Sequence, residues 1–186
     1  MKRIHVISLV LVTFILDQWT KIWAVARLGD ANGNPSGESI EVLGTYFRFT
    51  LAYNYGSAFS IKPWKLVPII TPTVFYTILT AVAFFFLVRF YKSLHQKDWM
   101  SQTGILLILS GALGNLMDRF RLGKVVDFLD SEFPDISIGS YYMQRWPTFN
   151  LADSWVLIGI ACILLSPILY KELHPQEKKE AKVDEQ

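Results

Sequence analysis

Four long apolar segments divide the chain, and polar stretches separate them. The segments cover residues 4–28, 66–90, 99–117 and 151–170. A helix that crosses a membrane needs about 20 mainly apolar residues, and each segment is close to that length. The pattern therefore predicts an all-α membrane protein with four transmembrane helices.

The stretch between the first two spans has a different pattern. Residues 30–44 are dense in Gly, Asn, Pro and Ser, which predicts a polar loop. Residues 46–60 are rich in aromatic and β-branched side chains that partly alternate with polar ones, which favours short strands. We therefore expect a small β-sheet between helices 1 and 2, followed by an interfacial anchor at Trp64.

The amino-acid composition agrees with a membrane protein and also limits its domain organisation and its partners. Of the 186 residues, 52% are hydrophobic, and the mean hydropathy is +0.30. We expect a single membrane-embedded domain over residues 1–171 and a charged, disordered tail over residues 172–186. The net charge of +2 is too small to suggest a nucleic-acid partner. The single cysteine, Cys162, allows neither an internal disulfide nor a cysteine metal cluster.

Acidic and amide side chains gather where the third span ends and the fourth begins. Residues 111–120 have the sequence G-A-L-G-N-L-M-D-R-F, residues 125–128 V-V-D-F, and residues 146–154 W-P-T-F-N-L-A-D-S. Ionisable groups at the edge of a membrane cost free energy, which indicates a function. Asp127 and Asp153 are the leading candidates, because their immediate neighbours are apolar.

Both aspartates also have simpler explanations. Asn150 and Asp153 match a variant capping box at the start of the fourth helix. Asp127 could form an ion pair with Lys124 or Arg121 in a solvated loop, although its apolar neighbours favour a drier setting. As a pair, two carboxyls that share one proton could hydrolyse a peptide bond, one as general base and the other as general acid.

The first span carries a charged pair of its own. Asp17 and Lys21 are four residues apart and so lie on one helical face. They could form an internal ion pair that makes both groups tolerable in the membrane, and they could also support a site. Further along, the acidic residues Asp130, Glu132 and Asp135 predict a solvated loop.

The chain resembles the lipoprotein signal peptidase, or signal peptidase II, family of bacterial four-helix membrane aspartyl proteases. The resemblance rests on G-N-L-M-D-R-F-R-L-G-K-V-V-D-F followed by F-N-L-A-D-S. D-Q-W-T-K at residues 17–21 and N-Y-G-S-A-F-S at residues 54–60 fit the same family, so the resemblance covers roughly residues 4–170. The linker at residues 130–140 is longer than is usual in this family.

The resemblance implies an aspartic endopeptidase that removes signal peptides from prolipoproteins. It would cut before a cysteine that carries diacylglycerol, with Asp127 and Asp153 as the catalytic pair and with no metal or organic cofactor. We expect other residues to bind substrate or support the site: Asp17, Lys21, Asn54, Gly111, Asn115, Asp118, Arg119 and Asn150. Arg119 could bond carbonyls at the end of the third helix, and Asp118 could orient it.

The resemblance also implies a location and partners. The protein would lie in the bacterial inner membrane, with both termini cytoplasmic and the site and the small sheet at the outer face. Nine Lys and Arg residues on the cytoplasmic side against seven outside support this orientation weakly. The expected partners are lipidated prolipoproteins and membrane lipid, and we expect a monomer.

Two other functions remain open from the residues alone. A small transporter could use Asp17, Asp127 and Asp153 to carry protons or cations, although clustering of the acids at one membrane face disfavours this. A metal-dependent hydrolase could be built on Asp and Asn oxygens, and chelation with EDTA would reveal it.

Overall fold

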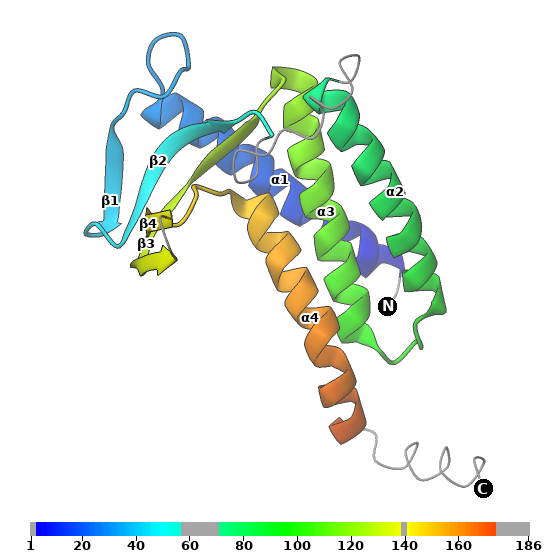
Figure 1. The fold of residues 1–186 in the computed structure, drawn as a ribbon. Coiled ribbons are helices and arrows are strands. Elements are labelled where there is room, and N and C mark those ends of the chain that lie inside the picture. The colour runs from blue at the N-terminus through cyan, green and yellow to red at the C-terminus, as the bar shows by residue number, and fades with distance from the viewer. Residues whose placement is uncertain (1–2, 57–70, 139–140, 174–186) are drawn as a thin grey trace, which may run out of the picture.

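The computed structural model describes residues 3–56, 71–138 and 141–173. In these residues a bundle of helices carries an antiparallel sheet beside one end (Figure 1). In chain order the elements are α1 (Arg3–Leu28), β1 (Ser39–Leu43), β2 (Phe47–Asn54), α2 (Pro72–Ser93), α3 (Trp99–Leu122), β3 (Val125–Ile138), β4 (Tyr141–Arg145) and α4 (Leu151–Leu173).

The prediction of four spanning helices is confirmed. Each of α1 to α4 is long and apolar enough to cross a membrane. Thr71 begins α2 by accepting a hydrogen bond from the N–H of Val74, and Pro72 occupies the first turn, where its missing N–H costs least. The first residues of the predicted second span, 66–70, lie outside the described residues, as do Trp64 and most of the predicted tail.

Helix α3 contacts each of the other three helices and is the most buried of them. Buried polar side chains join it to its neighbours. The hydroxyls of Thr13 in α1 and Ser110 in α3 are 2.7 Å apart, and Ser166 in α4 donates to the carboxylate of Asp98, the N-cap of α3, at 2.5 Å. Inside a membrane such groups have no water to bond, so the pairs hold the helices together.

The sheet has the strand order β1-β2-β3-β4, and all neighbours are antiparallel. Strand β2 confirms the strands predicted after the first helix, and β1 lies inside the segment expected to be a polar loop. The sequence analysis expected the sheet only between helices 1 and 2. It also contains β3 and β4, which lie between α3 and α4.

The prediction that Asp130, Glu132 and Asp135 belong to a solvated loop is wrong, because all three lie in strand β3. Asp130 is 4% exposed and pairs with Arg48 of β2 at 2.6 Å and with Arg145 of β4 at 2.7 Å. Arg145 also pairs with Glu132 at 3.0 Å. The acidic residues are therefore neutralised by arginines from neighbouring strands. The side chain of Asp135 lies outside those described.

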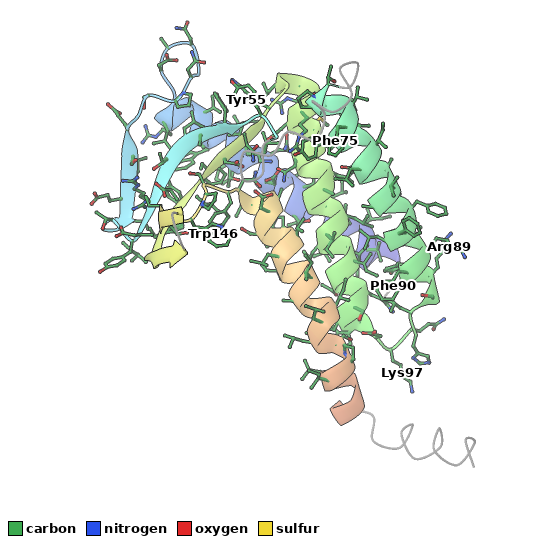
Figure 2. All side chains as sticks on the ribbon, in the orientation of Figure 1. Tyr55, Phe75, Arg89, Phe90, Lys97 and Trp146 are labelled. Carbon is green, nitrogen blue, oxygen red and sulfur yellow. The ribbon has the colours of Figure 1, made fainter. Side chains whose placement is uncertain are left out.

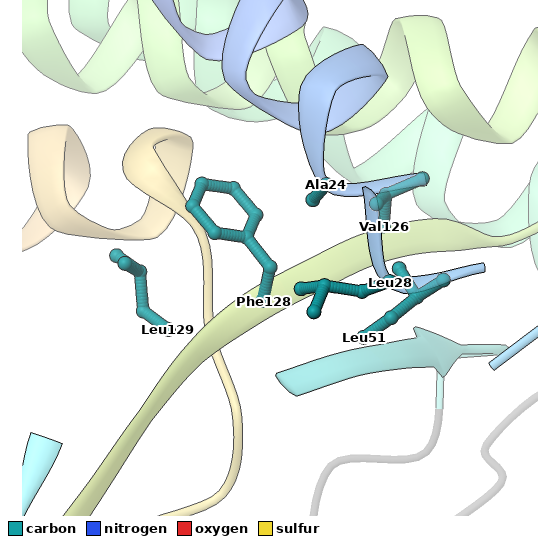
Figure 3. Packing of buried hydrophobic residues seen from close by; sticks show 6 residues of the cluster. All are labelled: Ala24, Leu28, Leu51, Val126, Phe128 and Leu129. Atoms are coloured by element: carbon teal, nitrogen blue, oxygen red, sulfur yellow. The ribbon is translucent and has the colours of Figure 1, made fainter. Parts of the chain in front are cut away.

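An apolar core fixes the sheet to the end of α1. Ala24 and Leu28 of α1 pack in one cluster with Leu51 of β2 and with Val126 and Phe128 of β3 (Figure 3). Side chains alternate between the two faces of a strand. With Val126 and Phe128 in the core, the intervening side chain of β3 points to the opposite face, and that side chain is Asp127.

Candidate active site

Asp127 lies in β3 and is 3% exposed. Asn150, fully buried just before α4, donates from Nδ2 to Asp127 Oδ1 at 2.6 Å and to the carbonyl of Val126 at 3.2 Å. The side chain of Asn54, at the end of β2, also hydrogen-bonds to the Asp127 carboxyl. The dry setting predicted for Asp127 is confirmed.

The alternative of a solvated loop ion pair for Asp127 is wrong. Lys124 lies with Nζ 3.4 Å from the centre of the Tyr53 ring, and Arg121 donates to Gln18 at 3.1 Å. Both cations therefore bind partners other than Asp127.

Asp153 lies in the first turn of α4 and forms the predicted capping box with Asn150. The N–H of Asp153 donates to Asn150 Oδ1 at 3.0 Å, and the N–H of Asn150 donates to Asp153 Oδ2 at 3.2 Å. These reciprocal bonds satisfy two of the free N–H groups at a helix start. The capping bond uses Oδ2 of Asp153, and Oδ1 of the same carboxyl binds a different partner.

That partner is Asn115 of α3, which connects the two carboxyls. Asn115 Nδ2 donates to Asp153 Oδ1 at 2.8 Å, while its Oδ1 accepts from Asn150 Nδ2 at 3.0 Å. Because Asn150 also donates to Asp127, the two amides form a continuous hydrogen-bonded link between Asp127 and Asp153. Residues far apart in the sequence are brought together in one site at the ends of three elements.

The electrostatics of the pair follow from its burial. Burial first, and then the negative charge of Asp153, raise the pKa of Asp127 to about 7, against hydrogen bonds from Asn150 and Asn54 that act to lower it. Like charges held close in a dry site do not ionise together easily. Asp127 can therefore hold a proton near neutral pH, as one member of an acid–base pair must.

A buried ion cluster supports both carboxyls from behind. Lys21 of α1 pairs with Asp17 at 2.9 Å and with Asp118 of α3 at 3.0 Å. Asp17 accepts the N–H of Ala152 at 2.9 Å, and Asp118 accepts the N–H of Val126 at 3.1 Å. These two backbone groups belong to the residues immediately before Asp153 and Asp127. The predicted internal ion pair is confirmed, and it also positions the site.

Lys21 and Gln18 extend this cluster. Lys21 donates to Asn115 Oδ1 at 3.0 Å, which joins the cluster to the amide link. Gln18 donates to Asp17 at 3.1 Å and to Asp118 at 3.2 Å. The sequence analysis gave Gln18 no role. An amide beside Asp17 inside an apolar span was the signal that could have identified it.

Arg119 joins the site to the start of α2. Its guanidinium donates to the carbonyl of Asn115 at 3.2 Å, as expected for the end of the third helix, and lies 4.1 Å from the centre of the Tyr76 ring. The Tyr76 hydroxyl donates to the Gly56 carbonyl at 2.5 Å, and Asn54 Oδ1 accepts the Gly56 N–H at 2.8 Å. The expectation that Asp118 orients Arg119 is not met, because the bonds of Asp118 go to Lys21, Gln18 and Val126.

Gly111 allows α3 and α4 to approach each other closely at the site. A Cβ atom at this position would overlap the carbonyl oxygen of Ala152 and lie 2.8 Å from a methyl of Val156. Gly114 has a similar role toward α1, since its Cβ would lie 2.5 Å from an Asp17 oxygen. The small residues thus let the first turn of α4 lie against α3, within reach of Asn115. Figure 2 shows how polar atoms gather where the sheet meets the helix ends.

The fold and the site define a multi-pass membrane protein with a pair of carboxyls, the buried Asp127 and the half-buried Asp153, at one end of its helices. A family model described as Signal peptidase (SPase) II matches residues 9–169. The chain therefore belongs to the signal peptidase II family, whose members are aspartic membrane peptidases, and the resemblance seen in the sequence is confirmed.

Individual relatives agree with this assignment. The lipoprotein signal peptidase of Halothermothrix orenii is 36% identical over 156 residues, covering 84% of this chain and 90% of the relative. That of Psychromonas ingrahamii is 35% identical over 164 residues, covering 86% and 82%. Two solved bacterial membrane enzymes have TM-scores of 0.69 and 0.68 at 29% and 31% identity, and they cover 92% and 89% of this chain and 92% and 94% of their own.

Proposed function

We propose that this protein removes signal peptides from diacylglyceryl-modified prolipoproteins, hydrolysing the peptide bond before the lipidated cysteine. Asp127 and Asp153 form the catalytic pair. The observation that carries the proposal is the link Asp127–Asn150–Asn115–Asp153, because it connects a buried carboxyl to a half-buried one in a different environment. The names of the relatives supply the substrate class, and they give no support to the transporter alternative.

The two carboxyls divide the chemistry between them. Asp153 accepts two N–H donors and lies where the dipole of α4 favours negative charge, so it acts as the general base toward water. Asp127 holds the proton, donates it as a hydrogen bond to the scissile carbonyl, and so stabilises the developing oxyanion. Collapse of the tetrahedral intermediate then breaks the C–N bond. The proton that Asp153 took from water passes to the leaving amine.

The same proposal includes an orientation. The start of α1 and the end of α4 lie at the end of the bundle away from the sheet (Figure 1), whereas Asp127 belongs to strand β3 and Asp153 to the first turn of α4. With both termini in the cytoplasm, the pair lies at the outer face of the inner membrane, which supplies water from one side and acylated substrate from the other. The proposal includes a monomer as the active unit.

Product masses test the reaction directly. Purified protein is incubated with a lipidated prolipoprotein and with the same prolipoprotein lacking diacylglycerol. We expect cleavage of the lipidated form alone, with fragments whose masses place the cut immediately before the modified cysteine. Asp127→Asn serves as the inactive control. Proton or cation flux in proteoliposomes without cleavage would replace the proposal with the transporter alternative.

Chelation tests the metal-dependent hydrolase. Within the described part of the chain, no group of three or more His, Cys, Asp or Glu side chains is placed to hold a metal ion. We expect activity to survive exhaustive treatment with EDTA. Activity that is lost on chelation and returns with an added divalent metal would contradict the two-carboxyl mechanism.

A further inference from the structure

A cavity lies beside the ion cluster, between α1, the end of α3 and the sheet. Its volume is about 330 Å³, which is within the range of small-molecule sites. Apolar side chains form much of its wall: Ile22, Val25, Ala26, Leu122 and Val126. Neither Asp127 nor Asp153 is among the described residues that line the cavity.

Strand β3 separates this cavity from the carboxyl pair. Val126 lines the cavity, and Tyr53, its partner across the β2–β3 ladder, lines it too. Asp127 is the next residue along β3, and alternation directs its side chain to the other face of the sheet. The cavity is therefore distinct from the active site, although Lys21 and Asp118 in its wall belong to the ion cluster behind that site.

One positive charge without a carboxylate partner among the described residues, Arg121, lines the cavity, and a second, Lys124, contacts Tyr53 of its wall. Arg121 is exposed and donates to the neutral amide of Gln18 at 3.1 Å. Lys124 lies with Nζ 3.4 Å from the centre of the Tyr53 ring. These contacts are with uncharged groups, so they neutralise neither positive charge. By contrast, Lys21 deeper in the wall is already paired with carboxylates.

The surface around the cavity is apolar and belongs to spanning helices. Ile22 is 56% exposed and Leu122 is 44% exposed, so the cavity reaches the surface. Beside them Trp19 and Phe120 are each 63% exposed. In a membrane protein such side chains face acyl chains, while Arg121 in the last turn of α3 lies near the depth of the headgroups.

We propose that this cavity binds one anionic phospholipid from the surrounding membrane. An acyl chain occupies the apolar wall formed by Ile22, Val25 and Leu122, and Arg121 and Lys124 bind the headgroup phosphate. Charge complementarity selects this occupant, because an acyl chain alone would supply no negative charge to either cation. Bound lipid would brace α1 against α3 next to Lys21. The inference does not depend on the proposed proteolytic reaction.

Lipid binding is measured on delipidated, purified protein in a non-ionic detergent by native mass spectrometry. Phosphatidylglycerol and phosphatidylcholine of equal chain length are titrated separately. We expect phosphatidylglycerol to bind roughly tenfold more tightly, because the choline ammonium of phosphatidylcholine offsets the negative charge of its phosphate beside the two cations. Inorganic phosphate should compete poorly, because it lacks the acyl chain. Equal affinity for the two lipids, or full competition by inorganic phosphate, would overturn the proposal.

Two variants locate the binding. Arg121→Gln should weaken binding of phosphatidylglycerol roughly tenfold and binding of phosphatidylcholine by less, so that the preference between the two lipids shrinks. Ala26→Trp, at an exposed position in the wall, should fill the cavity and reduce binding of both lipids. The control is Arg89→Gln, which removes an exposed arginine near the end of α2, away from the sheet (Figure 2). A loss in Arg89→Gln as large as in Arg121→Gln would show general electrostatic attraction and refute the site. Melting curves without lipid confirm that each variant is folded.

Discussion

Asparagine in place of Asp127 tests the chemistry and the electrostatics of the carboxyl pair together. The folded protein holds the pKa of Asp127 at about 7, whereas the ordinary value is 3.8. Because the pKa of Asp127 is higher in the folded than in the unfolded protein, this group contributes its full stabilisation at a pH below the pKa of the unfolded chain. That contribution is lost as the pH rises through the folded value. About three pKa units correspond to about 4 kcal/mol between the two limits.

The asparagine side chain cannot ionise, so the variant should not lose this stability as the pH rises. Its new amide nitrogen replaces an oxygen that accepts a hydrogen bond in the native site, a cost of about 1 kcal/mol. We therefore expect Asp127→Asn to be more stable than the native protein by about 3 kcal/mol at pH 8 and less stable by about 1 kcal/mol at pH 4. Turnover should be abolished at every pH.

The measurement is thermal unfolding of the purified protein in detergent from pH 4 to pH 8, with turnover of a lipidated prolipoprotein followed in parallel. A native-minus-variant difference in melting temperature that changes sign across this range is the expected result. A variant that is destabilised equally at both ends of the range would refute the reasoning. Near-normal turnover would remove Asp127 from the catalytic pair.

Asp130→Asn is a matched control in the same strand. Burial acts to raise the pKa of Asp130, but hydrogen bonds from Arg145 and Arg48 outweigh it and hold the pKa below its usual range. A lowered pKa gives stability above the unfolded value that is lost as the pH falls, which is the opposite sign to Asp127. Asp130→Asn should therefore lower stability by about 2 kcal/mol at pH 7, and the difference should shrink in acid.

Three further substitutions test the supports of the site. Asp153→Asn should abolish turnover and cost about 1 kcal/mol in thermal unfolding, and normal turnover would show that Asp153 is only a cap. Gly111→Ala places a methyl group against the Ala152 carbonyl. This variant should therefore lower the free energy of unfolding by about 1–3 kcal/mol and reduce kcat. An unchanged melting curve would contradict the close approach of α3 and α4. Lys21→Met leaves buried carboxylates without their cation and should lower the free energy of unfolding by about 3–5 kcal/mol. The double variant Lys21→Met/Asp118→Asn should recover part of the lost melting temperature. No recovery would argue against the ion pair between Lys21 and Asp118.

The spans and the main site residues could be predicted because their signals are local. A membrane imposes a minimum apolar length, so four helices follow directly from the pattern. Asp127 and Asp153 were identifiable because each interrupts an apolar motif. The capping box at Asn150 was also visible, since it depends on two residues three apart.

The extent of the sheet could not be predicted, because its signals are distant in the sequence. Asp130 resembles a loop residue until Arg48, far earlier in the chain, and Arg145 are placed beside it. In the same way, the pairing of Lys21 with Asp118 requires α1 and α3 to be packed together. The hydrophobic pattern around a residue does not show which distant residue it pairs with.

Asn150 belongs both to the first turn of the final helix and to the hydrogen-bonded link between the carboxyls. During synthesis α4 follows α1, α2 and α3 into the membrane, and it brings Asn150 and Asp153 with it. A chain halted before that step has Asp127 but neither the second carboxyl nor the amide that holds the first. If Asp127 and Asp153 are the catalytic pair, as proposed, the activity begins only when α4 has been inserted.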